Sequence, residues 1–230
     1  MRKIDSHQHP TDMTPTMADC SLRNPDLIFA CCAKESEWYD LTRISAISDA
    51  IIPFFGTHPW YADGYTGPDK LTGMLAEHPR AGVGEIGLDR WHNDMQLQMS
   101  VFTEQLIIAD ELGRPVTIHM AGTEEHILRE IRHTDVPIIL HSFSGPRSYI
   151  GPFTSCNCYF SISPRFWKIG HRRTEGLLEM IPADRLLIET DAPNNDVGIP
   201  EMTERISCVL GISADELSEI VFRNMVSIIP

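Results

Sequence analysis

Two histidines, His7 and His9, stand one residue apart in the run IDSHQH near the start of the chain. Alternate residues of a β-strand share a face, so both imidazoles can point into the same cavity. Imidazole is a common metal ligand, and it can carry a proton near neutral pH. The pair therefore predicts metal chemistry, with partners supplied by the rest of the chain.

Residues of the same chemical types stand at the ends of other short apolar runs. Five of the ten histidines do so, whereas the other five fall in expected helices or loops, where a solvated or capping role suffices. Glu189 and Asp191 are spaced like the histidine pair, so we expect them to share a face as well. The strand-end candidates are His7, His9, His58, Glu85, His119, His141, Glu189 and Asp191.

These side chains would be costly to pack together without a cation, because they would repel one another or lack partners. Imidazole and carboxylate suit Zn²⁺, Mn²⁺ or similar ions better than Ca²⁺. One closed zinc site takes four protein ligands, whereas six of these candidates, with mixed nitrogen and oxygen donors, indicate two ions with a bridging group. None of the four lysines ends a strand, so the bridge is not a carbamylated lysine and Glu85 is the available carboxylate.

Eight short apolar runs alternate with longer amphipathic or polar stretches. Near-continuous apolar strands separated by helices predict a parallel sheet buried on both faces, and eight units favour a closed (β/α)₈ TIM barrel. No composition break marks a linker, so we expect one domain over residues 1–230. The runs are 2–7, 27–33, 50–56, 81–87, 115–120, 137–143, 158–163 and 186–193.

Helix signals occupy most of the gaps between these runs. Apolar residues recur at three- and four-residue spacing over 93–112, and Thr123 is a candidate N-cap for a helix over 123–135. Ser213 with Glu216 forms a capping-box pattern at the start of 213–227. The gap between the first two strands is short for a full helix.

Composition excludes several classes of protein. The net charge is 19 − 32 = −13, which argues against a broad basic face for nucleic acid or anionic membrane. The first residues are polar and no apolar run approaches ~18 residues, so we expect no signal peptide and no membrane span. Six cysteines without paired metal-knuckle spacing fit a reducing compartment, and we expect a cytoplasmic protein.

The ordered motifs resemble the TatD family of metal-dependent hydrolases, within the amidohydrolase-type barrels. The run RNMVSII near the end of the chain also resembles the closing helix of that family. The matching motifs, in the family's order between residues 4 and 193, are IDSHQH, GTHP, GEIGLD, IH at 118–119, HSFSG and LLIETDAP.

This resemblance implies a role for each matching residue. His7, His9 and Asp191 would hold one divalent ion, Glu85 would bridge, and His119 with His141 would hold a second, the ions being Zn²⁺, Mn²⁺ or Mg²⁺. Family members act mainly as DNases, some trimming single strands from the 3′ end. Asp191 would also accept the proton of the attacking water. Glu189 and His58 would orient ligands or touch the substrate, unless they are ordinary hydrogen-bonded rim residues.

Two departures from the family pattern concern the substrate. Family members usually carry an arginine soon after the histidine of the fifth strand, and here the run is HMAGTEE. An aromatic residue often follows ETDAP in the family, and here Asn194, Asn195 and Asp196 follow. Both changes remove groups that would hold a phosphate or stack on a base, while all six candidate ligands remain. This pattern predicts that the metal chemistry is retained and leaves the substrate open.

Three functional hypotheses follow. The first is a deoxyribonuclease or phosphodiesterase acting on single-stranded DNA ends or a small phosphoester, with Arg90, Arg147 and Arg165 gripping phosphate or merely solvated. The second is a hydrolase of a small ester, amide or lactone, which the missing arginine favours. The third is a non-catalytic metal-binding scaffold. The presence of all six candidate ligands argues against this hypothesis, because a protein released from catalysis could lose them freely. The protein would be a monomer or a small homo-oligomer.

Overall fold

The structure, a computed structural model, describes residues 1–92, 94–168 and 176–230. Its eight strands are parallel and lie in sequence order, each paired with the next one along the chain. A bridge between Gln8 and Ala192 brings the last strand segment against the first, so the sheet nearly closes. The predicted (β/α)₈ barrel is confirmed. The strands are β1 (Ile4–Gln8), β2 (Leu27–Cys31), β3 (Ile51–Phe55), β4 (Gly82–Asp89), β5 (Val116–Ala121), β6 (Ile138–Leu140), β7 (Cys158–Ile162) and β8 (Leu186–Ile188).

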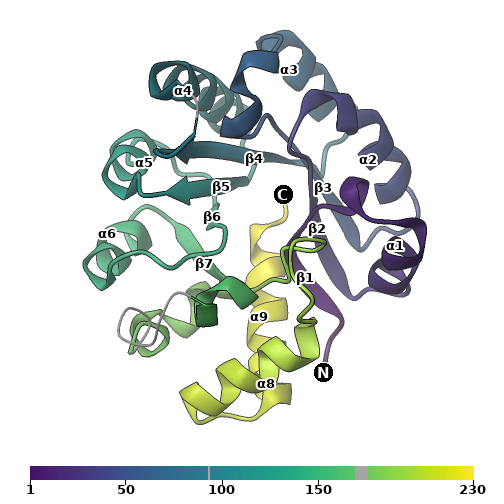
Figure 1. Ribbon diagram of the computed structural model, residues 1–230, viewed down its shortest axis with the longest axis vertical. Coiled ribbons are helices and arrows are strands. Elements are labelled where there is room, and N and C mark those ends of the chain that lie inside the picture. Colours follow the sequence, from purple (N-terminus) through teal and green to yellow (C-terminus); the bar gives the residue numbers. More distant parts are fainter. Residues whose placement is uncertain (93, 169–175) are drawn as a thin grey trace.

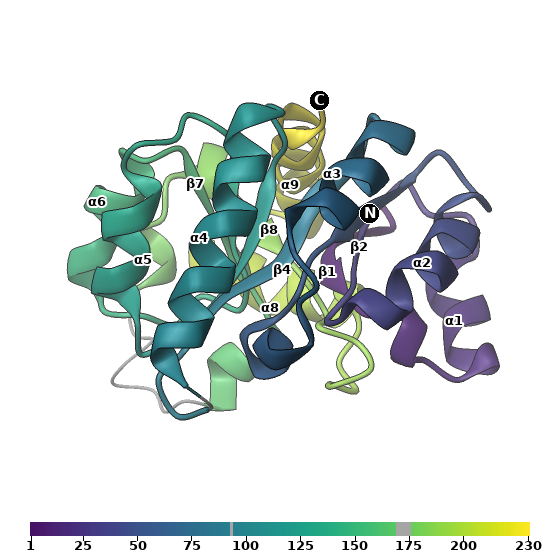
Figure 2. The ribbon, with the colours of Figure 1, turned by 90° about the horizontal axis from the view of Figure 1, so that it is seen from above.

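Helices surround the strands on the outside. Figure 1 shows the helices following one another around the sheet, and α8 beside α9 next to β1. Figure 2 shows α1 and α2 on one side of the barrel and α5 and α6 on the other, with strands between. The helices are α1 (Pro15–Leu22), α2 (Trp38–Ser45), α3 (Pro68–Glu77), α4 (Met95–Glu111), α5 (Glu124–Ile131), α6 (Ile150–Thr154), α8 (Ile199–Leu210) and α9 (Ala214–Ile228).

The predicted helix starts and caps agree with the structure in part. Residue 93, where one predicted helix begins, lies outside the described residues, and α4 starts after Asp94, which caps it. The Ser213 hydroxyl accepts a hydrogen bond from the Glu216 amide and caps α9 as predicted. Thr123 is the N-cap residue of α5 as predicted, but its hydroxyl donates to the Leu88 carbonyl and makes no capping hydrogen bond to the helix. The short first gap still holds the eight-residue α1.

The last strand is shorter than the apolar pattern indicates. β8 ends at Ile188, so Glu189 and Asp191 lie in the segment that follows it. Asp191 has a left-handed backbone (φ 52°), and its amide donates to the carbonyl of His7. The expectation that Glu189 and Asp191 share one strand face is therefore wrong, because neither lies on a strand, although both side chains reach histidines of the site.

Two strands have register irregularities close to the candidate ligands. In β1 the irregularity lies between Asp5 and Gln8, around His7, and in β4 it lies between Val83 and Ile86, around Glu85. Such bulges redirect side chains and are frequent beside active sites. Gly87 also brings β4 close to β5, because a Cβ there would lie 2.0 Å from the carbonyl oxygen of His119.

The apolar side chains of the strands are nearly all fully buried and belong to one core cluster. Among the helices of the described residues, none combines the length and apolar character needed to cross a lipid bilayer.

Candidate metal centre

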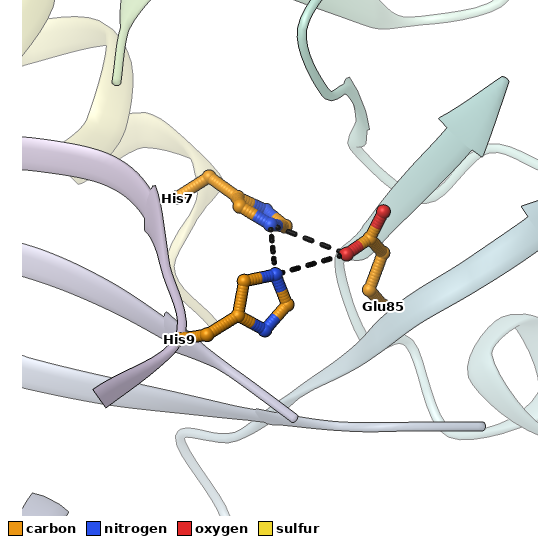
Figure 3. Close-up of side chains that lie close together, drawn as sticks. All are labelled: His7, His9 and Glu85. Atoms are coloured by element: carbon orange, nitrogen blue, oxygen red, sulfur yellow. Dashed lines mark hydrogen bonds and ion pairs between the residues drawn. The ribbon is translucent and has the colours of Figure 1, made fainter. Parts of the chain in front are cut away.

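The two histidines of β1 meet a carboxylate of β4 inside the barrel mouth, the end where the carboxyl ends of the strands converge. The Nε2 atoms of His7 and His9 are 3.0 Å apart, and they lie 3.3 Å and 3.2 Å from Oε2 of Glu85 (Figure 3). All three side chains are buried. The second ring nitrogen of His7, Nδ1, contacts the thiol of Cys31 at 3.4 Å, which leaves Nε2 directed at Glu85.

The other oxygen of Glu85 faces a second group of histidines. Oε1 lies 3.0 Å from Nδ1 of His119, 3.5 Å from Nε2 of His58 and 3.9 Å from Nε2 of His141. His58 stands just after β3, where its Nδ1 accepts a hydrogen bond from the amide of Trp60. The carboxylate of Glu85 therefore stands between two sets of imidazoles, with one oxygen toward each.

The two carboxylates after β8 contact different histidines. Glu189 is fully buried, and its Oε1 lies 2.9 Å from Nδ1 of His141 and accepts from the amide of Ser142. Oδ1 of Asp191 lies 4.0 Å from Nε2 of His9 and accepts from the side-chain amide of Asn194. Glu189 thus orients an imidazole at the back of the site, whereas Asp191 lies at the opening.

Burial and mutual charge shift the pKa values of these groups in opposite directions. Burial alone would raise the pKa of Glu85, but the imidazoles of His58, His141 and His7 hold it well below its usual range. Burial lowers the pKa of His58 to about 4. Burial also opposes the charged form of His141, yet Glu189 and Glu85 outweigh it and raise its pKa to about 10. The centre is built around negative charge that attracts cations.

The residues present fit a metal centre. Three overlapping groups bring ligand atoms within 4.8 Å of one another: His7, His9 and Glu85; His7, His141 and Glu189; and His58, Glu85 and His119. The point between His7, His9 and Glu85 is surrounded by three atoms that each offer a lone pair, an arrangement that a cation stabilises. Mixed imidazole and carboxylate donors suit Zn²⁺ and similar ions.

Asp89, at the end of β4, is a member of the site that the sequence motifs did not single out. Its Oδ2 accepts a hydrogen bond from the indole Nε1 of Trp60 at 2.8 Å and lies 3.4 Å from Nε2 of His119. The bond with His119 holds the pKa of Asp89 well below its usual range, although burial opposes this. The signal was available, since Asp89 ends a strand inside the quoted motif GEIGLD.

The predicted substrate-binding arginines lie in different places. Arg165 lines the hollow of about 280 Å³ that opens onto Glu85, together with His58 and Asp191. Arg90 is exposed and its guanidinium lies 5.7 Å from the ring centre of Trp91. Arg147 is exposed in a short 3₁₀ segment after β6. Neither Arg90 nor Arg147 is among the residues that line this hollow.

A parallel-stranded barrel with histidines and carboxylates gathered at its mouth is the architecture of the amidohydrolase-type metal-dependent hydrolases. The sequence model of the family described as TatD related DNase matches residues 4–230 of this chain. The chain therefore belongs to the TatD family and is a metal-dependent hydrolase of that family.

Relatives and solved structures agree with this placement. The chain is 30% identical to the "3'-5' ssDNA/RNA exonuclease TatD" of Erwinia tasmaniensis, over 71% of this chain and 72% of that protein. It is 23% identical to the "Uncharacterized metal-dependent hydrolase YcfH" of Escherichia coli K12, over 96% and 93% of the two chains. The crystal structure of the TatD homologue YjjV from Escherichia coli K12 superposes with a TM-score of 0.82, at 23% identity, over 98% of this chain and 97% of that one.

Proposed function

We propose that this protein hydrolyses phosphodiester bonds of single-stranded nucleic acid with two divalent metal ions. One observation carries the proposal: the two oxygens of the buried Glu85 face two separate sets of histidines. A carboxylate in that position suits a bridge between two ions. The exonuclease name of the Erwinia tasmaniensis relative supports a nucleic acid as the substrate.

Six residues would hold the ions. His7, His9 and Asp191 would hold one ion, His119 and His141 the other, and Glu85 would bridge them. When bound, two divalent ions lower the pKa of a water molecule and offset the charge of a phosphate.

The remaining steps fall to side chains of this chain. Asp191 would accept the proton of the attacking water, because its carboxylate lies at the opening of the site, 15% exposed, where water enters. Glu189 would hold the ring of His141 in one orientation through its contact with Nδ1. Arg165 would hold a phosphate oxygen at the rim, where its guanidinium meets solvent.

Metal analysis followed by activity assays tests the proposal. The purified protein is assayed with Mn²⁺, Mg²⁺ and Zn²⁺ on single-stranded DNA, a generic phosphate diester and a carboxylic ester, with Asp191→Asn as the control. We expect metal-dependent cleavage of DNA at low salt, lost in the Asp191→Asn variant. Less than one bound or supportable metal ion per chain contradicts the proposal.

A hydrolase of a small ester, amide or lactone is the second candidate. Among the described residues that line the hollow over Glu85, Arg165 is the single arginine or lysine. The run HMAGTEE that begins at His119 also lacks the arginine that family members usually carry soon after this histidine. Few fixed cations favour a less charged substrate. Turnover of a carbonyl substrate by protein that leaves oligonucleotides intact would select this alternative.

A further inference from the structure

Two hollows flank the candidate metal centre and share one wall. The Trp60 hollow, of about 280 Å³, is lined by Trp60 and Tyr61 and opens onto Glu85. The Trp91 hollow, of about 180 Å³, is lined by Trp91 and extends over the end of β5. Both are also lined by His119, His141 and Arg165. A ligand that crosses the centre would therefore reach both hollows.

Each hollow carries exposed aromatic rings. Trp60 is 44% exposed and Tyr61 is 38% exposed, while Trp91 is 73% exposed. Exposed tryptophan is costly for a protein that gains nothing from it, because a large apolar ring stays in water. Three such rings around one catalytic opening indicate a ligand with flat, stackable groups.

One carboxylate, that of Asp89, contacts both tryptophan residues and His119. Oδ2 of Asp89 accepts from the indole of Trp60, and Oδ1 of Asp89 accepts from the backbone amide of Trp91 at 2.9 Å. Because Oδ2 also contacts His119, the aromatic residues are tied to a candidate metal ligand. The Trp60 ring is thus positioned relative to the reacting centre, and one of its faces stacks on His92 with the ring centres 4.9 Å apart.

The position of the Trp91 side chain also depends on a glycine, Gly122. Gly122 has a left-handed backbone (φ 66°), and a Cβ there would lie 2.7 Å from Cη2 of Trp91 and 2.4 Å from Cδ of Arg90. Absence of a side chain at this position lets the ring lie over the end of β5. The position of Trp91 is therefore built into the fold of two neighbouring strands.

Cationic groups accompany the rings in a chain of net charge −13. The Nζ of Lys34, which also pairs with Glu37 at 2.9 Å, lies 5.2 Å from the centre of the Tyr61 ring, and the guanidinium of Arg90 lies near Trp91. Positive charges beside aromatic rings are the combination with which proteins bind single-stranded nucleic acid. Arg165 lies in the shared wall, where a phosphate between two bases would be placed.

We propose that the Trp60 and Trp91 hollows are two base-stacking subsites, which hold the nucleobases on either side of the cleaved phosphate of a single strand. This inference rests on the proposed phosphodiesterase function and adds how the strand is held. A duplex keeps its base faces stacked inside, so these rings select unpaired strands. Every base has a flat face, so the subsites tolerate any sequence.

Tryptophan fluorescence provides a test that needs no turnover. Octathymidylate with phosphorothioate linkages, which resist hydrolysis, is titrated into the metal-loaded protein. A strand of the same length and linkage without bases is the comparison ligand. We expect tryptophan quenching with octathymidylate and none with the strand that lacks bases. The Trp91→Ala variant should lose part of the quenching and bind octathymidylate about tenfold more weakly, as one lost stacking contact predicts.

Two variants separate stacking from general damage. Trp91→Phe keeps an aromatic ring and should restore most of the affinity. Tyr39→Ala removes a ring that is 74% exposed on α2 and lines neither hollow, so binding should remain as in the unmodified protein. Trp60 is less suitable for a first test, because its replacement also removes the hydrogen bond to Asp89.

The outcomes distinguish this inference from the proposed function. If the unmodified protein cuts DNA while Trp91→Ala binds octathymidylate with unchanged affinity, the inference of base-stacking subsites is overturned. The proposed phosphodiesterase function is then supported. Equal binding and quenching with the baseless strand also overturns the subsites. Quenching by octathymidylate in a protein that cuts no phosphodiester supports the subsites and overturns the proposed function alone.

Discussion

Two buried carboxylates of the barrel have pKa values shifted in opposite directions. Glu85, at the barrel mouth, is 2% exposed and faces imidazoles from both sides. Asp5, at the seam between β1 and the segment after β8, is 4% exposed and accepts hydrogen bonds from Thr190 and from the amide of His7. The pKa of Glu85 lies well below its usual range, whereas burial raises the pKa of Asp5 to about 7.

The difference shows that burial alone does not determine what a carboxylate does. Neutral donors around Asp5 hold the seam of the barrel together but offset little of the cost of a buried charge. Groups able to carry positive charge surround Glu85 and make its anion the favoured form. Asp5 is therefore a structural element, and Glu85 is suited to hold cations.

The largest effect should follow replacement of Glu85. In a Glu85→Gln variant we expect metal affinity to fall by more than about a hundredfold, since loss of a ligand exceeds the roughly 10- to 100-fold cost of losing an outer partner. Metal analysis after dialysis and metal-dependent turnover measure the loss. Glu204→Gln, an exposed change of the same chemistry on α8, is the control. Full metal content in Glu85→Gln would contradict the bridging role.

A smaller loss is expected for Glu189. The Glu189→Gln variant keeps its shape but no longer carries the charge beside Nδ1 of His141. We expect metal affinity to fall by about 10- to 100-fold, as is typical for a partner that orients a ligand. A competition titration with a metal-sensitive dye gives the affinity. A loss as large as that of Glu85→Gln would show that Glu189 contacts metal directly.

At the seam, replacement of Asp5 should affect stability more than metal binding. Asp5→Ala leaves the buried amides of His7 and Thr190 without acceptors, so we expect the free energy of unfolding to fall by about 2–4 kcal/mol. Urea denaturation of the metal-free protein measures it. The matched variant Asp184→Ala, with a side chain 78% exposed, should change stability by less than about 0.5 kcal/mol.

The pH dependence of that stability gives the smallest and most specific test. The pKa of Asp5 in the folded protein, about 7, exceeds the value of ~3.9 of an unfolded aspartate. Between these values the folded state binds more protons, so the free energy of unfolding falls as pH rises. Asparagine has no such proton to lose.

The stability advantage of the natural protein over Asp5→Asn should therefore shrink from about pH 5 to about pH 8. Urea denaturation of both chelator-treated proteins at each pH tests this. A constant difference across the range would show that Asp5 does not titrate there.

The barrel and most of the candidate centre were predictable because their signals are local. Short apolar runs mark buried parallel strands, and the histidines with Glu85 stand at the ends of those runs. The divergence of Glu189 and Asp191 was not predictable, because β8 ends at Ile188 and the left-handed turn at Asp191 depends on its bond to His7. The role of Asp89 depends on Trp60, which comes from another loop.

By itself, the sequence determined the number and order of the strands, the kinds of side chain at their ends and the family. These follow from patterns of neighbouring residues, which hydrophobic burial enforces strand by strand. Only the tertiary structure decided which oxygen of Glu85 faces which histidines, and that Asp89 accepts a hydrogen bond from the indole of Trp60. Those contacts join residues far apart in the chain, and their geometry depends on strand register and loop conformation, which are set when the barrel closes.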